Sequence, residues 1–242
     1  MTQTETVVVI GAGDALGSAI ARRFAKEGYL AVLVRRDGEK LEPLVDQIKA
    51  EGGQAFGLAC DARKEDQMTA LFEQVEQAHG PIAACVFNIG ANVRFSIVET
   101  TSRVYFKVWE MACFAGFLTG REAARHMLTR NKGTIIFTGA TASLRGRDGF
   151  SAFAGAKAAL RALAQSMARE LGPQGIHVAH TLIDGPIDTQ WIADNFPESY
   201  ARKEADGILN PEHIAENYWQ LHRQPRDAWT HELDLRPWSE SW

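Results

Sequence analysis

The sequence predicts an α/β fold, a doubly wound parallel sheet with helices on both faces, in a single domain over residues 1–242. Short apolar runs alternate with longer amphipathic runs, and the first apolar run, 6–10, is an unbroken β-branched stretch. Such runs are typical of strands buried on both faces of a parallel sheet. The chain has 242 residues, 45% of them hydrophobic and 23% charged, as expected for one α/β domain with a substantial core.

The first half of the chain contains four strands, each followed by an amphipathic or loop segment. After the strand at 6–10 comes a helix at 14–28, in which Leu16, Ile20 and Phe24 recur at helical spacing. The following elements are expected at 31–34 (strand), 39–50 (helix), 55–60 (strand), 65–79 (helix) and 82–87 (strand). Glycine is the usual residue just beyond a helix, and the three helices stop at Gly28, Gly52 and Gly80.

The second half continues the same alternation. A long helical pattern at 102–128 is followed by a strand at 133–138, a helix at 150–171 and a strand at 176–182. The helix at 150–171 has its large apolar residues on one side, at Phe150, Leu160, Leu163 and Met167. Strict alternation implies right-handed crossovers, and no repeat or linker interrupts it. These observations predict one domain.

Composition narrows the classes of partner. The net charge is −4 with no basic block, which argues against nucleic acid and against an anionic membrane surface. The three cysteines are scattered and lack CxxC spacing, which argues against disulfides or a metal site and suits a reducing compartment. The polar N-terminus lacks the pattern of a secretory signal, and the longest apolar stretch, 111–118, is too short to span a bilayer. We therefore expect a cytoplasmic protein.

A glycine-rich turn lies between the first strand and the first helix. A phosphate needs backbone N–H groups, a helix N-terminus and no intervening Cβ, and small residues at this turn meet those needs. Alone the triplet indicates only a tight turn, but its place between a buried strand and a helix favours a Rossmann-like dinucleotide site. The candidate residues are Gly11, Gly13, Asp14, Ala15, Leu16 and Gly17.

The residues after the second strand bear on the choice of cofactor. No acid stands at the strand end to accept a hydrogen bond from a ribose 2′-hydroxyl; Arg35 and Arg36 are there instead. Paired guanidinium groups favour a 2′-phosphate, although arginines on a turn are often simply solvated and Asp14 opposes an anion. We expect NADP(H) in preference to NAD(H). Asp61, after the third strand, suits the adenine end or an N-cap of the following helix.

By these motifs the chain resembles the short-chain dehydrogenase/reductase family along nearly its whole length. The glycine loop is similar to the family's TGxxxGxG, with Ile10 and Ala15 as departures. The turn from Asn88 to Gly90 resembles its Asn-Ala-Gly, and Lys157 resembles the lysine of its YxxxK helix. Residues 183–189 resemble the stretch that grips the nicotinamide amide, which implicates Gly185, Ile187 and Thr189, with Asp184 in place of a proline. The start of the family's last helix resembles 210–215.

The resemblance implies hydride transfer between nicotinamide and a carbonyl or alcohol carbon, using a tyrosine, lysine, serine and asparagine. Carried onto this sequence, the tyrosine position is Phe153, the serine position Ala140 and the asparagine position Ala112. Only Lys157 remains. The tyrosine position of the family's enoyl reductases falls on Phe150.

Phenylalanine neither donates nor accepts a proton, so another group must serve if turnover occurs. Thr141 adjoins the missing serine, Lys157 in apolar surroundings is expected to have a lowered pKa, and Asp184 and Asp188 lie on the loop beside the nicotinamide. The aspartates suit turns and caps equally well. Phe153 itself is either a core residue or a cation–π support for Lys157.

Two classes of function stay open at this point. One is an oxidoreductase acting on a small apolar carbonyl, alcohol or activated double bond with a non-standard proton donor. The other is a catalytically inactive cofactor-binding protein, a redox sensor or a non-catalytic subunit. Reduction of an activated double bond or iminium needs no strong acid and fits the altered site better than ketone reduction.

Two further segments complete the expectations. Residues 185–209, with Trp191 and Phe196, are long enough for a lid over a small ligand or over the cofactor alone. A tryptophan-rich C-terminal tail, 229–242, either packs on the domain or forms a subunit interface. The family resemblance implies a homodimer or homotetramer built on the two long helices.

Overall fold

The computed structural model describes residues 4–240, and its core is a seven-stranded sheet in the order β3-β2-β1-β4-β5-β6-β7. Every neighbouring pair of strands is parallel. The strands are β1 (Thr6–Ile10), β2 (Leu30–Arg35), β3 (Gln54–Ala59), β4 (Ile82–Phe87), β5 (Gly133–Thr138), β6 (Ile176–Ile183) and β7 (Glu232–Leu235). The order reverses between β1 and β4, so the sheet is doubly wound, as the sequence predicts.

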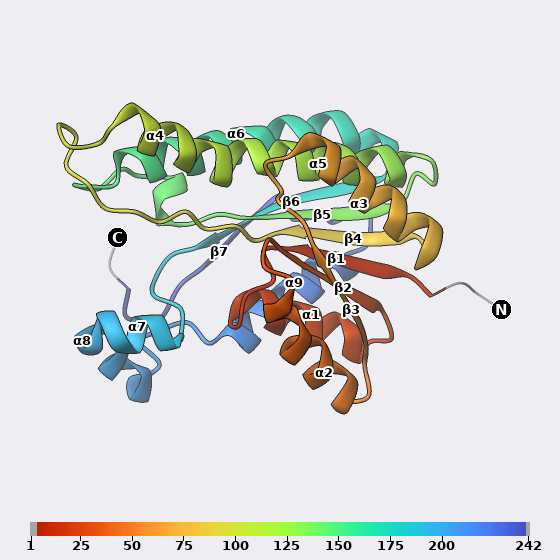
Figure 1. Cartoon of the computed structure of the whole chain (residues 1–242), viewed down its shortest axis with the longest axis horizontal. Helices are drawn as coiled ribbons and strands as arrows, with labels where there is room; N and C mark the ends of the chain where they lie inside the picture. The colour runs from red at the N-terminus through yellow and green to blue at the C-terminus, as the bar shows by residue number, and fades with distance from the viewer. Residues whose placement is uncertain (1–3, 241–242) are drawn as a thin grey trace.

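Helices cover both faces of this sheet (Figure 1). One layer contains α1 (Leu16–Lys26), α2 (Glu42–Ala50) and α9 (Pro211–Arg223); the other contains α3 (Glu65–Ala78), α4 (Ser102–Trp109), α5 (Ala115–Leu128) and α6 (Ser151–Leu171). Each layer buries its own apolar cluster against the sheet, and residues of β1 alternate between the two clusters. Because both faces are covered, β1, β4 and β6 are buried along their whole length. This explains the β-branched run of β1 and the apolar run of β4. β6 is buried although it carries His177, His180 and Thr181.

The predicted helix at 102–128 is divided in the structure. A π-helical segment, Glu110–Phe114, lies between α4 and α5 and contains Ala112. Amphipathic periodicity continues through such a segment, so the sequence gives little sign of it. π-Segments are rare and often occur at functional sites, which makes this part of the helix a candidate wall of the site.

The predicted lid, 185–209, is not a plain loop. It contains the short helices α7 (Gln190–Asn195) and α8 (Pro197–Tyr200) and a 3₁₀ turn, Ala201–Ala205. A parallel bridge between Ile187 and Leu209 ties its two ends together. Trp191 and Phe196 are half-exposed and their rings lie 5.3 Å apart. The segment is therefore a small folded excursion with a narrow base.

The tail also has more structure than the sequence suggests, because Glu232–Leu235 forms β7 beside β6. The charged, short run hides this strand from a hydrophobicity pattern. Trp229 stacks on His177, whereas Trp238 is 80% exposed and donates its Nε1–H to the Ala205 carbonyl. Trp242 lies outside the described residues.

The remaining elements are the 3₁₀ turns Glu39–Leu41, Thr141–Ser143 and Gly172–Gln174. Within residues 4–240, no helix is both long and apolar enough to cross a membrane.

Candidate active site

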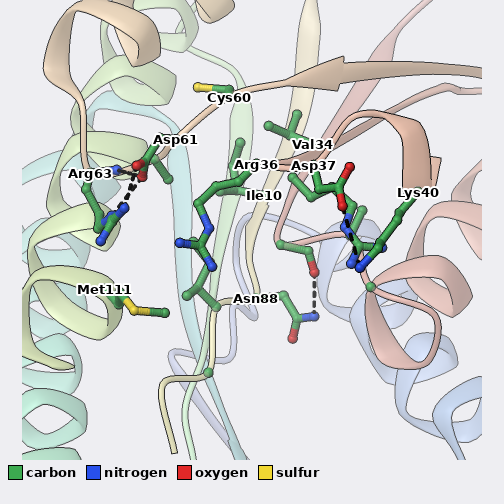
Figure 2. Close-up of a pocket in the computed structure, with 17 residues that line it drawn as sticks. Ile10, Val34, Arg36, Asp37, Lys40, Cys60, Asp61, Arg63, Asn88 and Met111 are labelled. Atoms are coloured by element: carbon green, nitrogen blue, oxygen red, sulfur yellow. Dashed lines mark hydrogen bonds and ion pairs between the residues drawn. The ribbon is translucent and has the colours of Figure 1, made fainter. Parts of the chain in front are cut away.

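A cavity of about 540 Å³ opens at the carboxyl edge of the sheet, where the strand order reverses. It is lined by the residues that follow β1, β2, β3 and β4, and by Met111 from the π-segment (Figure 2). Ligands of open parallel sheets bind at this position in the topology. The structure thus brings to one cavity Gly11 and Gly13 of the glycine turn, the arginines after β2, Asp61 and the Asn88–Gly90 turn. The other predicted cofactor residues do not line it, namely Asp14, Ala15, Leu16, Gly17, Lys157, Gly185, Ile187 and Thr189.

The glycine turn has the backbone that a phosphate requires. Gly11 has φ +89°, and a Cβ there would approach the Asn88 carbonyl oxygen to 2.6 Å. At Gly17 a Cβ would lie 2.6 Å from the Gly11 oxygen, so both positions need glycine for packing. Gly13 differs, because a Cβ there would meet nothing within 4 Å. Its bare backbone faces open space, which leaves room for a ligand.

The N-terminus of α1 adds to this cradle. Ala15 occupies the N-cap position and no side chain caps the helix, so its first N–H groups are free of side-chain acceptors. Leu16 begins the helix and is buried. With the helix dipole aimed at the turn, an anion is favoured there.

The cations after β2 are not equivalent. Arg35 is paired with Asp14, with 3.3 Å between Nη1 and Oδ1. Arg36 has no hydrogen bond or ion pair within residues 4–240, and Figure 2 shows its side chain extending into the cavity between Asp61 and Asn88. Arg35 thus neutralises the charge of Asp14, which would otherwise repel an anion. Arg36 remains available to bind an anion.

Asp61 has a partner that the sequence analysis did not identify. Arg63 donates to both of its oxygens at 2.8 and 2.6 Å, and this guanidinium holds the pKa of Asp61 below its usual value. The N-cap of α3 is Lys64, so Asp61 does not cap that helix. Lys40 also lines the cavity. The sequence does contain a signal for this pair, because Arg63 follows Asp61 by two residues.

The turn after β4 closes the cavity floor. The Asn88 side-chain amide donates to the Gly11 carbonyl at 3.2 Å, which ties this turn to the glycine turn. Gly90 and Ile89 line the same cavity, and a Cβ at Gly90 would meet nothing within 4 Å. Asn88 therefore holds the two turns together through the hydrogen bond from its side chain to the Gly11 backbone.

Lys157 lies in α6 and is only 2% exposed. Its ammonium donates to the carbonyl oxygens of Ile89 at 3.0 Å and Thr138 at 2.8 Å, so it bridges the ends of β4 and β5. Burial lowers its pKa to about 8. The Phe153 ring centroid lies 5.9 Å from Nζ and the ring is itself buried, so Phe153 is a core residue that also lies within cation–π range of Lys157.

The three positions that the resemblance predicts as replaced belong to one apolar cluster. Phe153 and Ala112 are buried in it, and Ala140 packs against it from the end of β5. Phe150 is a further member at the start of α6. Around Lys157 these side chains offer methyl groups and rings but no hydroxyl or amide.

A polar group lies close to this cluster in sequence and in the fold. The Thr141 hydroxyl donates to Asp184 at 2.5 Å, and Asp184 is 3% exposed. The guanidinium groups of Arg145 and Arg236 lie 3.7 and 3.5 Å from its carboxylate oxygens. Two residues that the sequence suggested separately as proton donors thus form one network, neutralised by arginines that it did not suggest.

The segment after β6 begins the predicted lid. Gly185 has φ +150° and a Cβ there would lie 2.8 Å from Pro237, so glycine is needed for this approach. Ile187 forms the bridge to Leu209, and Thr189 caps α7 by accepting the Ile192 N–H at 3.1 Å. Asp188 pairs with Lys203 at 2.8 Å.

Comparison with known proteins accounts for this arrangement. The sequence profile of the short chain dehydrogenase family matches residues 5–200. The chain belongs to the short-chain dehydrogenase family. It is 51% identical to a short-chain dehydrogenase from Rhodopseudomonas palustris of known structure, with a TM-score of 0.84 and coverage of 98% of this chain and 100% of that one.

More distant members agree. The 3-oxoacyl-[acyl-carrier-protein] reductase MabA of Mycobacterium avium is 28% identical over 187 residues, which are 77% of this chain and 69% of that protein. A metagenomic short-chain oxidoreductase, solved in complex with NADP, is 26% identical with a TM-score of 0.81 and 98% coverage of both chains. The resemblance inferred from the motifs is confirmed. As a short-chain dehydrogenase the chain belongs to a family of oxidoreductases that use NAD(P).

The described part of the chain, 4–240, holds no group of three or more histidine, cysteine or acidic side chains suited to a metal ion.

Proposed function

We propose that this short-chain dehydrogenase binds NADP(H) and transfers a hydride to or from a small apolar substrate. The observation that carries the proposal is the cavity at the switch point of the sheet, with an open glycine cradle at Gly13 and an unpaired cation at Arg36. A 2′-phosphate is the anion that Arg36 suits, since Arg35 is already paired with Asp14. The related metagenomic oxidoreductase solved with NADP supports the same cofactor.

The residues would divide the work as follows. The glycine turn and the N-terminus of α1 hold the pyrophosphate, and Arg36 holds the 2′-phosphate. Lys157 binds the nicotinamide ribose, and its carbonyl partners fix its position. Gly185, Ile187 and Thr189 shape the nicotinamide side. When bound, the cofactor supplies or accepts a hydride.

The apolar cluster around Phe153 determines the reaction class that we propose. No hydroxyl stands at positions 153 or 140, so nothing there protonates an alkoxide. Reduction of an activated double bond or an iminium needs less acid assistance than ketone reduction. The Thr141–Asp184 pair is the nearest polar group to serve a substrate oxygen, and the folded lid at 185–209 would close over a small apolar substrate.

The specific alternative is cofactor binding without turnover. It is favoured by the buried Lys157, whose hydrogen bonds go to backbone carbonyls, and by Asp184, whose carboxylate is flanked by two guanidinium groups. Such a protein would act as a redox sensor or as a non-catalytic subunit.

Cofactor titration followed by a substrate screen tests both. We expect NADPH to bind more tightly than NADH, and Arg36→Ala to weaken NADPH binding about 10- to 100-fold while NADH binding stays unchanged. Arg35→Ala is the matched variant, since Arg35 is already paired with Asp14. Equal loss of both cofactors in Arg36→Ala would contradict the assignment of the 2′-phosphate.

The substrate screen covers aldehydes, ketones, enones and imines. Oxidation of NADPH with enones or imines, and little with ketones, is the expected result. Tight NADPH binding without turnover on any member of the panel would leave the non-catalytic function as the conclusion.

We also propose a homo-oligomer, a dimer or tetramer built on α4 and α5, which together form the first of the two long helices predicted at 102–128 and 150–171. Four aromatic rings stack along this helix pair at centroid distances of 6.1, 5.9 and 6.1 Å, namely those of Phe106, Trp109, Phe114 and Phe117. Phe106 is 58% exposed and Phe117 38%. Phe106, Trp109 and Phe117 are exposed and Phe114 is partly buried. A row of mostly exposed aromatic rings is typical of a subunit interface.

A further inference from the structure

A second cavity, of about 260 Å³, lies at the opposite edge of the sheet from the cofactor cavity. Its walls include residues at the amino ends of β4, β5 and β6, among them Ala83, Thr134 and His177. The cofactor cavity is lined from the carboxyl ends of the same parallel sheet. The two cavities share no lining residue, so the function proposed above does not use this one.

The second cavity is rich in unpaired cations. Arg223 and Arg226 line it, and within residues 4–240 neither has a carboxylate at ion-pair distance. Arg226 donates to the Asn131 carbonyl at 2.6 Å, and Arg223 lies over the Trp219 ring, 5.7 Å from its centroid. Lys132 is a third cation, paired with Glu5 at 2.7 Å. A net positive rim attracts an anion.

The interior of the cavity is aromatic. Tyr29, Trp219 and Trp229 line it together with the imidazoles of His177 and His222. Trp229 is stacked on His177 at 4.9 Å with only 2° between the planes. His222 is held by Tyr29 and Thr134, each at 3.0 Å, and burial lowers its pKa to about 4, so it is neutral at pH 7. Flat, neutral rings of this kind bind a planar apolar group.

We propose that this cavity is a binding site for a small aromatic carboxylate. The ring would lie among Trp219, Trp229 and the neutral imidazoles, and the carboxylate would accept hydrogen bonds from Arg223 and Arg226. The volume admits one ring with a carboxyl group and excludes a dinucleotide. Bidentate guanidinium–carboxylate pairing selects this anion over a neutral analogue of the same shape.

Tryptophan fluorescence tests the proposal, because Trp219 and Trp229 line the cavity. We expect full-length protein to bind benzoate with a Kd of about 1 mM, and benzamide at least about 10-fold more weakly, because the amide lacks the charge. Arg223→Gln and Arg226→Gln should each weaken benzoate binding about 10-fold. Arg169→Gln is the matched control, since Arg169 is exposed and also donates to a backbone carbonyl, that of Gln165.

Saturation with NADPH separates the two cavities. We expect the benzoate Kd to be unchanged by NADPH. Competition between the two would place benzoate in the cofactor cavity and overturn the proposal, as would equal binding of benzamide. Binding of inorganic phosphate without a benzoate response would likewise overturn it. The cavity would then bind anions through its cations alone, with no role for the aromatic rings. Circular dichroism of each variant confirms that the fold is retained.

Discussion

At position 153 a phenyl ring stands four residues before Lys157 on α6, and the ring contacts the ammonium without offering it an oxygen. The neighbouring positions 140 and 112 are alanines in the same apolar cluster. Positions 153, 140 and 112 therefore offer the site no hydroxyl or amide. Each of these residues can be tested by restoring one group at a time.

Restoring the hydroxyls should create carbonyl chemistry. We predict that Phe153→Tyr combined with Ala140→Ser raises NADPH-dependent ketone reduction at least about 10-fold above the wild type, since a positioned acid contributes about 10²–10⁴. Phe150→Tyr, also in the cluster, is the control and should not raise it. NADPH oxidation with a ketone panel is the measurement. If cofactor binding survives in the double variant and no activity appears, the missing hydroxyls are not the only defect.

Burial of Lys157 should make stability depend on pH. Its pKa is lowered to about 8 in the folded chain and is 10.5 in the unfolded one, so between these values the unfolded chain binds the extra proton. Stability from this residue therefore rises with pH across that window. We predict that the unfolding free energy of wild type minus that of Lys157→Met increases by about 1–3 kcal/mol from pH 7 to pH 10.

Urea unfolding at both pH values measures this difference. Lys40→Met, which removes an exposed ammonium, is the matched control and should show no such trend. A difference that stays constant from pH 7 to pH 10 would mean that Lys157 keeps its proton despite burial.

At the scale of elements, long continuous apolar runs in the sequence predict strands correctly, whereas short polar runs do not reveal them. The runs at 6–10 and 82–87 match β1 and β4 because strands buried on both faces need no alternation. β7 is missed because its pairing with β6, not its composition, makes it a strand. The π-segment at 110–114 is missed because one extra residue per turn leaves the amphipathic pattern nearly intact.

The candidate site also has parts that the sequence predicts and parts that it does not. The glycine turn was predictable because its conformation and close approaches demand glycine. The pairing of Thr141 with Asp184 was not, since 43 residues separate them and only the packing of β5 beside β6 brings them together. Arg145 and Arg236 escape prediction for the same reason.

The strand β7 is held by an ionic clamp that can be measured. Glu232 accepts from Arg161 at 2.5 and 2.7 Å and contacts His180 at 3.1 Å, and the Arg161 hydrogen bond holds the pKa of Glu232 below its usual value. We predict that Glu232→Gln lowers the thermal midpoint at pH 7 by about 3 °C, because one charged pair in a partly buried site is lost. Glu73→Gln, at an exposed position on α3, should leave the midpoint unchanged.

The effect of Glu232→Gln on the thermal midpoint should depend on pH, because the pKa of Glu232 is lowered in the fold. A carboxyl with a lowered pKa stabilises the fold above its unfolded value of 4.5, and this contribution is lost as pH falls through the folded value. The difference between wild type and Glu232→Gln should therefore shrink in acid. A difference that is equally large at pH 3 would assign the effect to packing and not to charge.

For the whole molecule, the sheet divides the surface into regions of different chemistry. The carboxyl edge carries the cavity that we propose for the cofactor and the folded segment 185–209. The amino edge carries the cationic aromatic cavity, and the outer surface of α4 and α5 carries the aromatic row. The last of these is exposed although its rings are large, and water contact with such rings is unfavourable. Association of copies through this row would remove it from water while leaving both cavities open to solvent from their edges.

We predict that the protein in solution is a dimer or tetramer and that Phe106→Glu combined with Phe117→Glu converts it to a smaller species. Each substitution places a carboxylate in the row, and burying two unpaired charges at a shared interface costs more than a standard contact returns. Val98→Glu, at a residue that is 90% exposed and outside the row, is the matched control and should leave the mass unchanged.

Light scattering of the intact chain measures the mass, and a second sample truncated after Leu235 separates the row from the C-terminal segment. An assembly built on α4 and α5 keeps its mass after truncation and loses it in the double glutamate variant. The reverse pattern would move the interface to the segment after β7, which contains the exposed Trp238. A monomeric wild type would contradict the predicted homo-oligomer, and the aromatic row would then not be an interface between copies of this chain.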